Sequence, residues 1–357
     1  MFPERLKIML KNALNVFSVS SISTAMRLAI EAIIARGLTA EVFGLYAIAV
    51  SLISVSQVFL SGGIRPLIQK NVSVVFKENN SGEIFSILSK SLILFILSCC
   101  FFIFIVQSYR LTNYQFENFD ILVSLFVPIL IGALATAIIY ICSDLFRIFG
   151  SIHYFIFYRE AAAPILLLPF CIIGFLLNQK TIHYFFYLTV FSLCVVALLS
   201  AVHISCLINS RKIGRGVPTT KLFSNRDLFF FWLSSEILGI IWIIRDKFSL
   251  LAITELMSLT DVAVLFLVIR LMTPLSMIKS SFNSLISPTV AQFYHRGELD
   301  ELNKAYQTLT QYLFTFLFPT FVLICIFGVE IITLIFGTKY NVDSGVITLL
   351  AFQSQGV

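Results

Sequence analysis

Long apolar stretches recur along the whole chain, and they constrain its fold more than any other feature. Each stretch is close to the ~20 residues that a helix needs to cross ~30 Å of hydrocarbon. The composition agrees with this, because 58% of the 357 residues are hydrophobic, only 12% are charged and the mean hydropathy is +0.94. Open strands would leave backbone groups unsatisfied in lipid. The chain is therefore predicted to be an all-α polytopic membrane protein.

The apolar pattern predicts nine membrane-spanning helices and the start of a tenth. It does not show the period-two alternation of an outer-membrane barrel. In sequence order the predicted spans are 12–35, 42–64, 86–108, 121–143, 161–177, 185–207, 228–253, 261–286 and 306–331, with a tenth that begins near 344 and is cut off at Val357.

Lysine and arginine are distributed unequally between the loops on the two sides. Cytoplasmic loops carry an excess of these residues, so their count sets the orientation. One side holds Arg5, Lys7, Lys11, Arg65, Lys70, Lys77, Arg147, Arg159, Arg211, Lys212, Arg215, Lys221, Arg226, Arg296 and Lys304. The other side holds only Arg36, Arg110, Lys180 and Lys339. The N-terminus is therefore predicted to be cytoplasmic. The net charge of +6 is a topogenic signal that calls for no nucleic-acid partner.

The loops and the cysteines argue against an enzyme. The longest predicted outer loop, 109–120, is too short for a water-soluble catalytic domain. No phosphate-binding loop motif is present. All seven cysteines fall in predicted spans, and none has metal-ligand spacing with a histidine. We therefore expect no enzymatic activity, no metal and no cofactor.

Three segments carry a resemblance to a known family. They are "ARGLTAEVFGLYAIAVSLIS" at 35–54, "SPTVAQFYHRGELDELNKAY" at 287–306 and "IFGTKY" at 335–340. "RDKFSLLAI" at 245–253 also lies where that family usually places an aspartate followed by an apolar run. The chain resembles the Wzx-type O-antigen flippases of the multidrug/oligosaccharidyl-lipid/polysaccharide exporter superfamily.

The resemblance implies two bundles of six helices around a central cationic cavity, in a bacterial inner membrane. It assigns 1–207 to an N-terminal lobe and 228–357 to a C-terminal lobe, joined by the basic linker 208–227. The C-terminal lobe is expected to be incomplete, because the tenth span stops at Val357. The implied activity is the flipping of undecaprenyl-pyrophosphate-linked oligosaccharide repeat units. The expected partners are this lipid-linked substrate, membrane lipids and other polysaccharide-assembly proteins.

The first span carries a polar stripe. Ser20, Thr24, Arg27 and Glu31 are spaced by four, three and four residues, which places them on one helix face over ~16 Å. A charge in the middle of a span is costly unless it faces protein or water. Two interpretations stay open. The stripe lines the translocation path, or Arg27 and Glu31 form an ion pair of only structural importance.

Further charges lie in the seventh and eighth spans. Arg245, Asp246 and Lys247 are consecutive and project about 100° apart on a helix, so they cannot all share one face. Asp246 is expected to pair with a cation from another helix, and a buried structural ion pair at Arg245 stays open as the alternative. Arg270 precedes Pro274 by four residues, and the proline should kink the helix there. Lys279 lies near the inner face, where a lysine can also extend to the interface. The candidate ligands for a diphosphate are Arg27, Arg245, Arg270 and Lys279, and the candidates for ion coupling are Glu31 and Asp246.

Two other functions remain open. An ion-coupled drug antiporter of the same superfamily would share the fold, but it would not need a broadly cationic cavity. An integral-membrane polysaccharide polymerase would have similar hydropathy, but it would carry a long outer loop.

Reporter fusions test the predicted topology. Fusions at Asn209 and Ser210 should report the cytoplasm, and fusions near Asn113 and Asn178 should report the outer side, because the positive charges are concentrated on one side. An outer signal at Asn209 would contradict the assignment of the spans.

Overall fold

The structure is a computed structural model that describes residues 2–77, 81–111, 124–210, 224–276 and 299–355. Within these ranges it is helical and contains no strand. The helices are α1 (Phe2–Gly37), α2 (Ala40–Ser61), α3 (Ile64–Leu67), η1 (Ile68–Val72), α4 (Ser73–Lys77), α5 (Ser81–Leu111), α7 (Phe126–Ile148), α8 (Ile152–Ile156), η2 (Phe157–Ala161), α9 (Ala162–Leu176), α10 (Ile182–Ser210), α11 (Asn225–Leu256), α12 (Leu259–Leu271), α14 (Leu299–Phe336) and α15 (Ser344–Gln355).

The all-helical membrane fold is confirmed at the level of its helices. Eight helical segments of the described chain are long and apolar enough to cross a membrane. Many large apolar side chains are exposed on the surface, such as Ile93 of α5, Leu198 of α10 and Leu334 of α14. A soluble protein rarely exposes so much contiguous apolar surface. These helix faces are suited to contact with lipid.

One predicted boundary is wrong. The fifth span was expected to begin at residue 161, but helix continues without a break from α8 through η2 into α9, over Ile152–Leu176. Arg159 and Glu160 therefore lie within a candidate span and not in a cytoplasmic loop. The charges suggested a loop, whereas in the fold they are paired with other charges, as described below.

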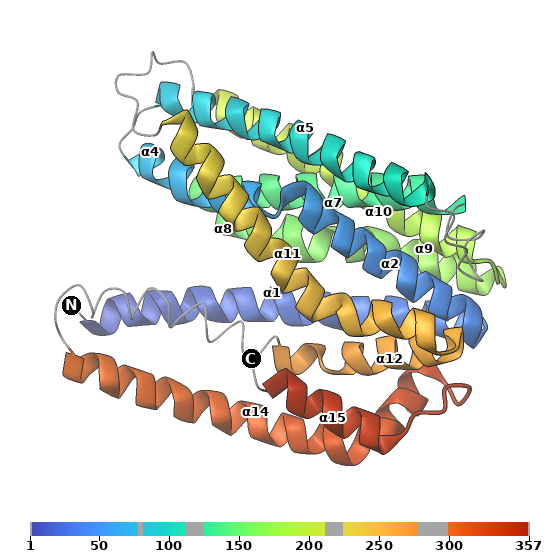
Figure 1. Cartoon of the computed structure of the whole chain (residues 1–357). Coiled ribbons are helices and arrows are strands. Elements are labelled where there is room, and N and C mark those ends of the chain that lie inside the picture. The colour runs from blue at the N-terminus through green and yellow to red at the C-terminus, as the bar shows by residue number, and fades with distance from the viewer. Residues whose placement is uncertain (1, 78–80, 112–123, 211–223, 277–298, 356–357) are drawn as a thin grey trace.

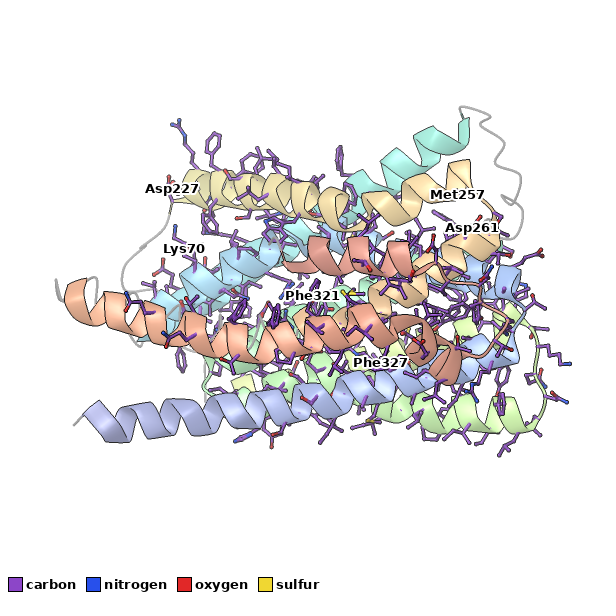
Figure 2. The ribbon with its side chains drawn as sticks, turned by 90° about the horizontal axis from the view of Figure 1, so that it is seen from below. Lys70, Asp227, Met257, Asp261, Phe321 and Phe327 are labelled. Carbon is purple, nitrogen blue, oxygen red and sulfur yellow. The ribbon has the colours of Figure 1, made fainter. Side chains whose placement is uncertain are left out.

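Helix α1 packs against α9 and η2 and also contacts α14 and α2 (Figure 1). Helix α2 packs against both α7 and α12, and α12 in turn contacts α14 and α15. Helix α11 runs from Asp227 at one end of the molecule to Met257 at the other, where Asp261 of α12 is nearby (Figure 2). The chain then reverses direction through a capping box, in which Ser258 and Asp261 bond each other's backbone amides. The division into lobes at 208–227 stays a prediction, because 211–223 lies outside the described residues.

Phe43 of α2 lies at the centre of the largest hydrophobic core and is fully buried. Its ring centroid is 5.9 Å from that of Phe266 in α12 and 5.9 Å from that of Tyr340, which follows α14. Edge-to-face ring contacts of this kind add about 0.5–1.5 kcal/mol beyond area burial. Phe43 therefore joins elements that are far apart in the sequence.

The ends of α1 and α14 cap each other. Arg36 donates from Nη2 to the Leu334 carbonyl at 2.5 Å and from Nε to the Ile335 carbonyl at 3.0 Å. In return, Tyr340 donates to the Ala35 carbonyl at 2.9 Å, and Lys339 Nζ donates to the carbonyl of Leu38, which directly follows α1. The last carbonyls of a helix have no partner within it, so these contacts satisfy both helix ends. Burial lowers the pKa of Lys339 below its ordinary value.

Gly44 allows the closest approach of α2 to α12. A Cβ atom there would lie 2.1 Å from the Leu259 carbonyl oxygen. Gly44→Ala should therefore force the two helices apart and lower stability by about 1–3 kcal/mol. Thermal unfolding in detergent measures the change. Gly37→Ala is the matched control, because its Cβ would make only ordinary contacts at 3.7 Å. Equal unfolding temperatures for the two variants would contradict the close packing.

Candidate functional site

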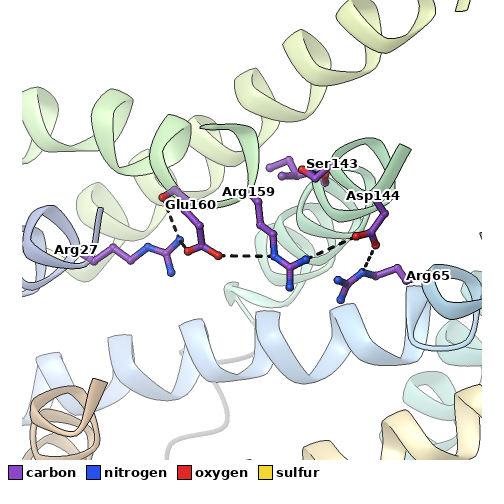
Figure 3. Close-up of polar contacts among 7 residues, drawn as sticks. Arg27, Arg65, Ser143, Asp144, Arg159 and Glu160 are labelled. Atoms are coloured by element: carbon purple, nitrogen blue, oxygen red, sulfur yellow. Dashed lines mark hydrogen bonds and ion pairs between the residues drawn. The ribbon is translucent and has the colours of Figure 1, made fainter. Parts of the chain in front are cut away.

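Five charged side chains of alternating sign form a continuous row across four elements (Figure 3). We call it the charged row. In order, its members are Arg27 of α1, Glu160 and Arg159 of η2, Asp144 of α7 and Arg65 of α3. The closest N–O distances along the row are 3.0 Å, 3.7 Å, 3.7 Å and 2.9 Å. With three cations and two anions, the row has a formal charge of +1.

Asp144 is the most deeply buried member. Its side chain has no exposed surface, and it contacts Arg65 through Oδ2 and Arg159 through Oδ1. Both guanidinium groups also lie near the ring of Tyr140, with their Cζ atoms 4.8 Å and 5.3 Å from its centroid. Asp144 and Tyr140 are four residues apart on α7 and so share one helix face. One face of α7 therefore holds both arginines.

A proline explains how Arg27 is held at the end of the row. Pro164 lies four residues after Glu160 and has no amide to donate to the Glu160 carbonyl. Just before it, the backbone winds into the π-helical turn η2. Arg27 Nη2 donates to the Glu160 carbonyl at 3.1 Å and to the Glu160 carboxylate at 3.0 Å. Because Pro164 has no N–H, the Glu160 carbonyl lacks its usual donor within the helix. It accepts a hydrogen bond from Arg27 of α1 instead.

The three cations of the row and Glu160 are partly exposed, whereas Asp144 is fully buried. The exposed fractions are 45% for Arg27, 33% for Glu160, 28% for Arg159 and 21% for Arg65, against 0% for Asp144. A guanidinium group has five N–H donors, and Arg65 bonds Asp144 through Nε. Among the described residues, the terminal amino groups of Arg65 have no hydrogen-bond acceptor, so they remain available to a ligand. The arrangement can bind an anion with several oxygens.

A second ion pair ties α1 to α12. Arg270 Nε lies 2.8 Å from Glu31 Oε1, and the Arg270 guanidinium lies 4.6 Å from the centroid of the Phe266 ring. Helix α12 ends at Leu271, with Met272 as its C-cap, shortly before Pro274. This agrees with the interruption that the proline predicted. Helix α1 therefore pairs with η2 through Arg27 and with α12 through Glu31.

Three of the six residues singled out in the sequence lie in this arrangement, namely Arg27, Glu31 and Arg270. Arg27 and Glu31 pair with residues of other helices, Glu160 and Arg270, and not with each other. Their assignment to substrate binding and ion coupling stays a prediction. The side chains of Arg245 and Asp246, and all of Lys279, lie outside the described part of the chain.

Arg65, Asp144, Arg159 and Glu160 are not among the candidate site residues predicted from the sequence. The residue pattern places Arg65 and Arg159 in inner loops, as topogenic charges. A signal was present, because Tyr140 and Asp144 are spaced by four near the end of an apolar span. The adjacent Arg159 and Glu160, shortly before Pro164, were a second signal.

Comparison with known proteins gives one match. A family model described as polysaccharide biosynthesis protein matches residues 170–344, a little under half of the chain. The match includes Arg270 but none of the five residues of the charged row. A search of curated proteins finds no match. A search of solved structures also finds none.

A double-mutant cycle tests the tie between α1 and α12. Glu31→Gln and Arg270→Gln should each lower the unfolding temperature, because each leaves a charge without its partner. The double variant should lose less stability than the two single variants lose together, which corresponds to a coupling energy of about 1–3 kcal/mol. Glu41→Gln is the control partner, because Glu41 is exposed on α2. Additive effects for Glu31 and Arg270 would contradict the pairing.

Proposed function

We propose that this protein flips undecaprenyl-pyrophosphate-linked oligosaccharide repeat units across a bacterial inner membrane. The match to polysaccharide biosynthesis proteins and the membrane-spanning helices support a polysaccharide-related transporter. The single observation that carries the proposal is the charged row, in which three guanidinium groups follow one another within the helical bundle. The expected partners are the lipid-linked substrate and membrane lipids, with no cofactor and no enzymatic step.

The chemistry of the row suits a diphosphate. A guanidinium group is planar and binds phosphate oxygens through two parallel N–H donors. Asp144 and Glu160 hold the arginines in place when no substrate is bound, so the cations are not left unpaired in an apolar region. An entering diphosphate replaces part of this pairing without a large change in the geometry of the arginines. A cationic drug would meet repulsion at the same place, so the row favours the flippase over the drug antiporter.

Helix α1 is suited to link binding with movement. It pairs with η2 through Arg27 and with α12 through Glu31, and these two residues lie one turn apart on the same helix face. A substrate that draws Arg27 away from Glu160 would loosen one of these ties and leave the other in place. In this proposal, the protein alternates between its two conformations by breaking and re-forming the ion pairs that α1 makes with η2 and α12. Glu31 is a candidate for coupling because it lies in the second tie, and Asp246 stays a further candidate.

Substitution of Arg65 tests the proposed function. Arg65→Gln should reduce surface polysaccharide by tenfold or more at normal membrane abundance, because a hydrogen bond to a charged group is worth about 1.5–3 kcal/mol. Arg65→Lys should retain part of the activity, since it keeps the charge but not the planar fork. The measurement uses cells in which the chromosomal copy is deleted and the variant is supplied.

Arg147→Gln is the matched control for Arg65→Gln. Arg147 is exposed on the same α7 that carries Asp144, and its guanidinium lies over the ring of Phe155 at 5.5 Å. This variant should leave surface polysaccharide unchanged. Normal polysaccharide in the Arg65→Gln cells would contradict the proposal. So would a loss of polysaccharide of the same size in both variants.

A further inference from the structure

A buried carboxyl group lies between α11 and the end of α2, outside the charged row. Glu236 of α11 is only 8% exposed. Its Oε2 atom accepts the backbone N–H of Gly63 at 2.5 Å. Its Oε1 atom is also buried and has no hydrogen-bond partner among the described residues. An acid of this kind, in a helix predicted to span the membrane, marks a functional site by default.

Glycines form the surroundings of this carboxyl group. A Cβ atom on Gly63 would lie 2.9 Å from Glu236 Oε2 and 2.4 Å from the Trp232 carbonyl oxygen. A Cβ atom on Gly239, one turn further along α11, would lie 3.5 Å from the Cα atom of Gly62. At Gly63 the backbone therefore lies directly against α11, and a side chain there would displace the Glu236 carboxyl group; at Gly239 a Cβ atom would make only an ordinary contact with Gly62. Within the described part of the chain, no group of three or more His, Cys, Asp or Glu side chains lies here that could hold a metal cation.

No cation is available to neutralise Glu236 within the described part of the chain. The charged groups nearest in sequence to Gly63 are Arg65 on α3 and Lys70 on η1. Arg65 is paired with Asp144 at 2.9 Å, and Lys70 lies over the ring of Phe231, 4.3 Å from its centroid. Helix α2 contributes Gln57 to the buried interior, but no charge. A buried carboxylate without a paired cation is costly, and binding a proton removes that cost.

We propose that Glu236 is the proton-binding site that drives this transporter. The inference rests on the proposed flippase function, and it names the coupling ion. In the state seen here the carboxyl group carries a proton, and Oε1 is the oxygen that holds it. The proton leaves as H⁺ when Glu236 becomes accessible to water, and the carboxylate left behind takes up another from the opposite side of the membrane.

The position of Gly63 connects this site to the charged row. Gly63 is the N-cap of α3, and α3 carries Arg65 two residues later. The first amides of a helix have no partner within it, so Glu236 satisfies a donor that α3 cannot satisfy itself. Loss of the proton favours water around the carboxylate and separates α11 from α3. The movement changes the placement of Arg65, so proton release and substrate release are linked.

Carbodiimide labelling tests the site without any transport. A hydrophobic carbodiimide reacts with protonated carboxyl groups, and peptide mass spectrometry locates the adduct in the purified wild-type chain. We expect an adduct at Glu236 that decreases as the pH rises, while exposed Asp227, in the first turn of the same α11, serves as the internal control. Absence of an adduct at Glu236 in the folded protein would overturn the proposal. This result does not depend on the identity of the transported lipid.

Flipping in proteoliposomes tests the coupling. The wild type should flip a lipid-linked oligosaccharide several-fold faster with a pH gradient than without one. Glu236→Gln, which imitates the protonated carboxyl group, should flip at the rate without a gradient under both conditions. Asp227→Asn should behave as the wild type does, because Asp227 is exposed at the start of α11. If Glu236→Gln still flips faster with a pH gradient, the proposal that Glu236 is the proton site is wrong, whereas the proposed flippase function is unaffected. If Glu236 is labelled but the protein flips no lipid-linked oligosaccharide, the proposed flippase function is wrong. Glu236 would then bind a proton without driving flipping.

Discussion

The buried charge of Asp144 is the constraint on which the surrounding ion pairs depend. Its carboxylate is completely buried and is shared by Arg65 and Arg159, which come from different helices. Removing a charge from water costs several kcal/mol, and the cost is recovered only when the partners and the geometry are good. Charges this deep in an apolar bundle therefore position the helices that carry them. Asp144 therefore helps to place α3, α7 and η2 relative to one another, together with the apolar cluster that includes Ile64 of α3 and Phe146 of α7.

Two local irregularities of the backbone make the arrangement possible. Pro164 removes an amide, the chain winds into the π-helical turn η2, and the Glu160 carbonyl becomes free to accept a bond from Arg27. π-Helical turns occur frequently at functional sites, because they redirect side chains within an otherwise regular helix. A second interruption, at Gly62 and Gly63, lets Glu236 reach the first amide of α3. Both irregularities lie next to an arginine of the charged row.

The sequence predicted the helices well and the pairing of the charges poorly. Apolar stretches long enough to cross a membrane are a local signal, so the helices follow directly from residue order. The choice of partner is not local. Arg27 and Glu31 share one face of α1, and their spacing of four suggested a pair within that helix. Instead Arg27 bonds Glu160, 133 residues away, and Glu31 pairs with Arg270 of α12. The tertiary neighbours of α1, which include η2 and α12, decide this, and a single sequence does not show which helices become neighbours.

Binding of a soluble short-chain prenyl diphosphate to the purified protein tests the central claim most directly. If the arginines of the charged row bind a diphosphate, the wild type should bind the diphosphate at least tenfold more tightly than the matching monophosphate, because the second phosphate adds charge-assisted hydrogen bonds of about 1.5–3 kcal/mol each. Most of this preference should disappear in a folded variant that lacks the Arg65 and Arg159 guanidinium groups. Equal affinities of the wild type for the two ligands would contradict the claim, and so would an unchanged preference in the variant.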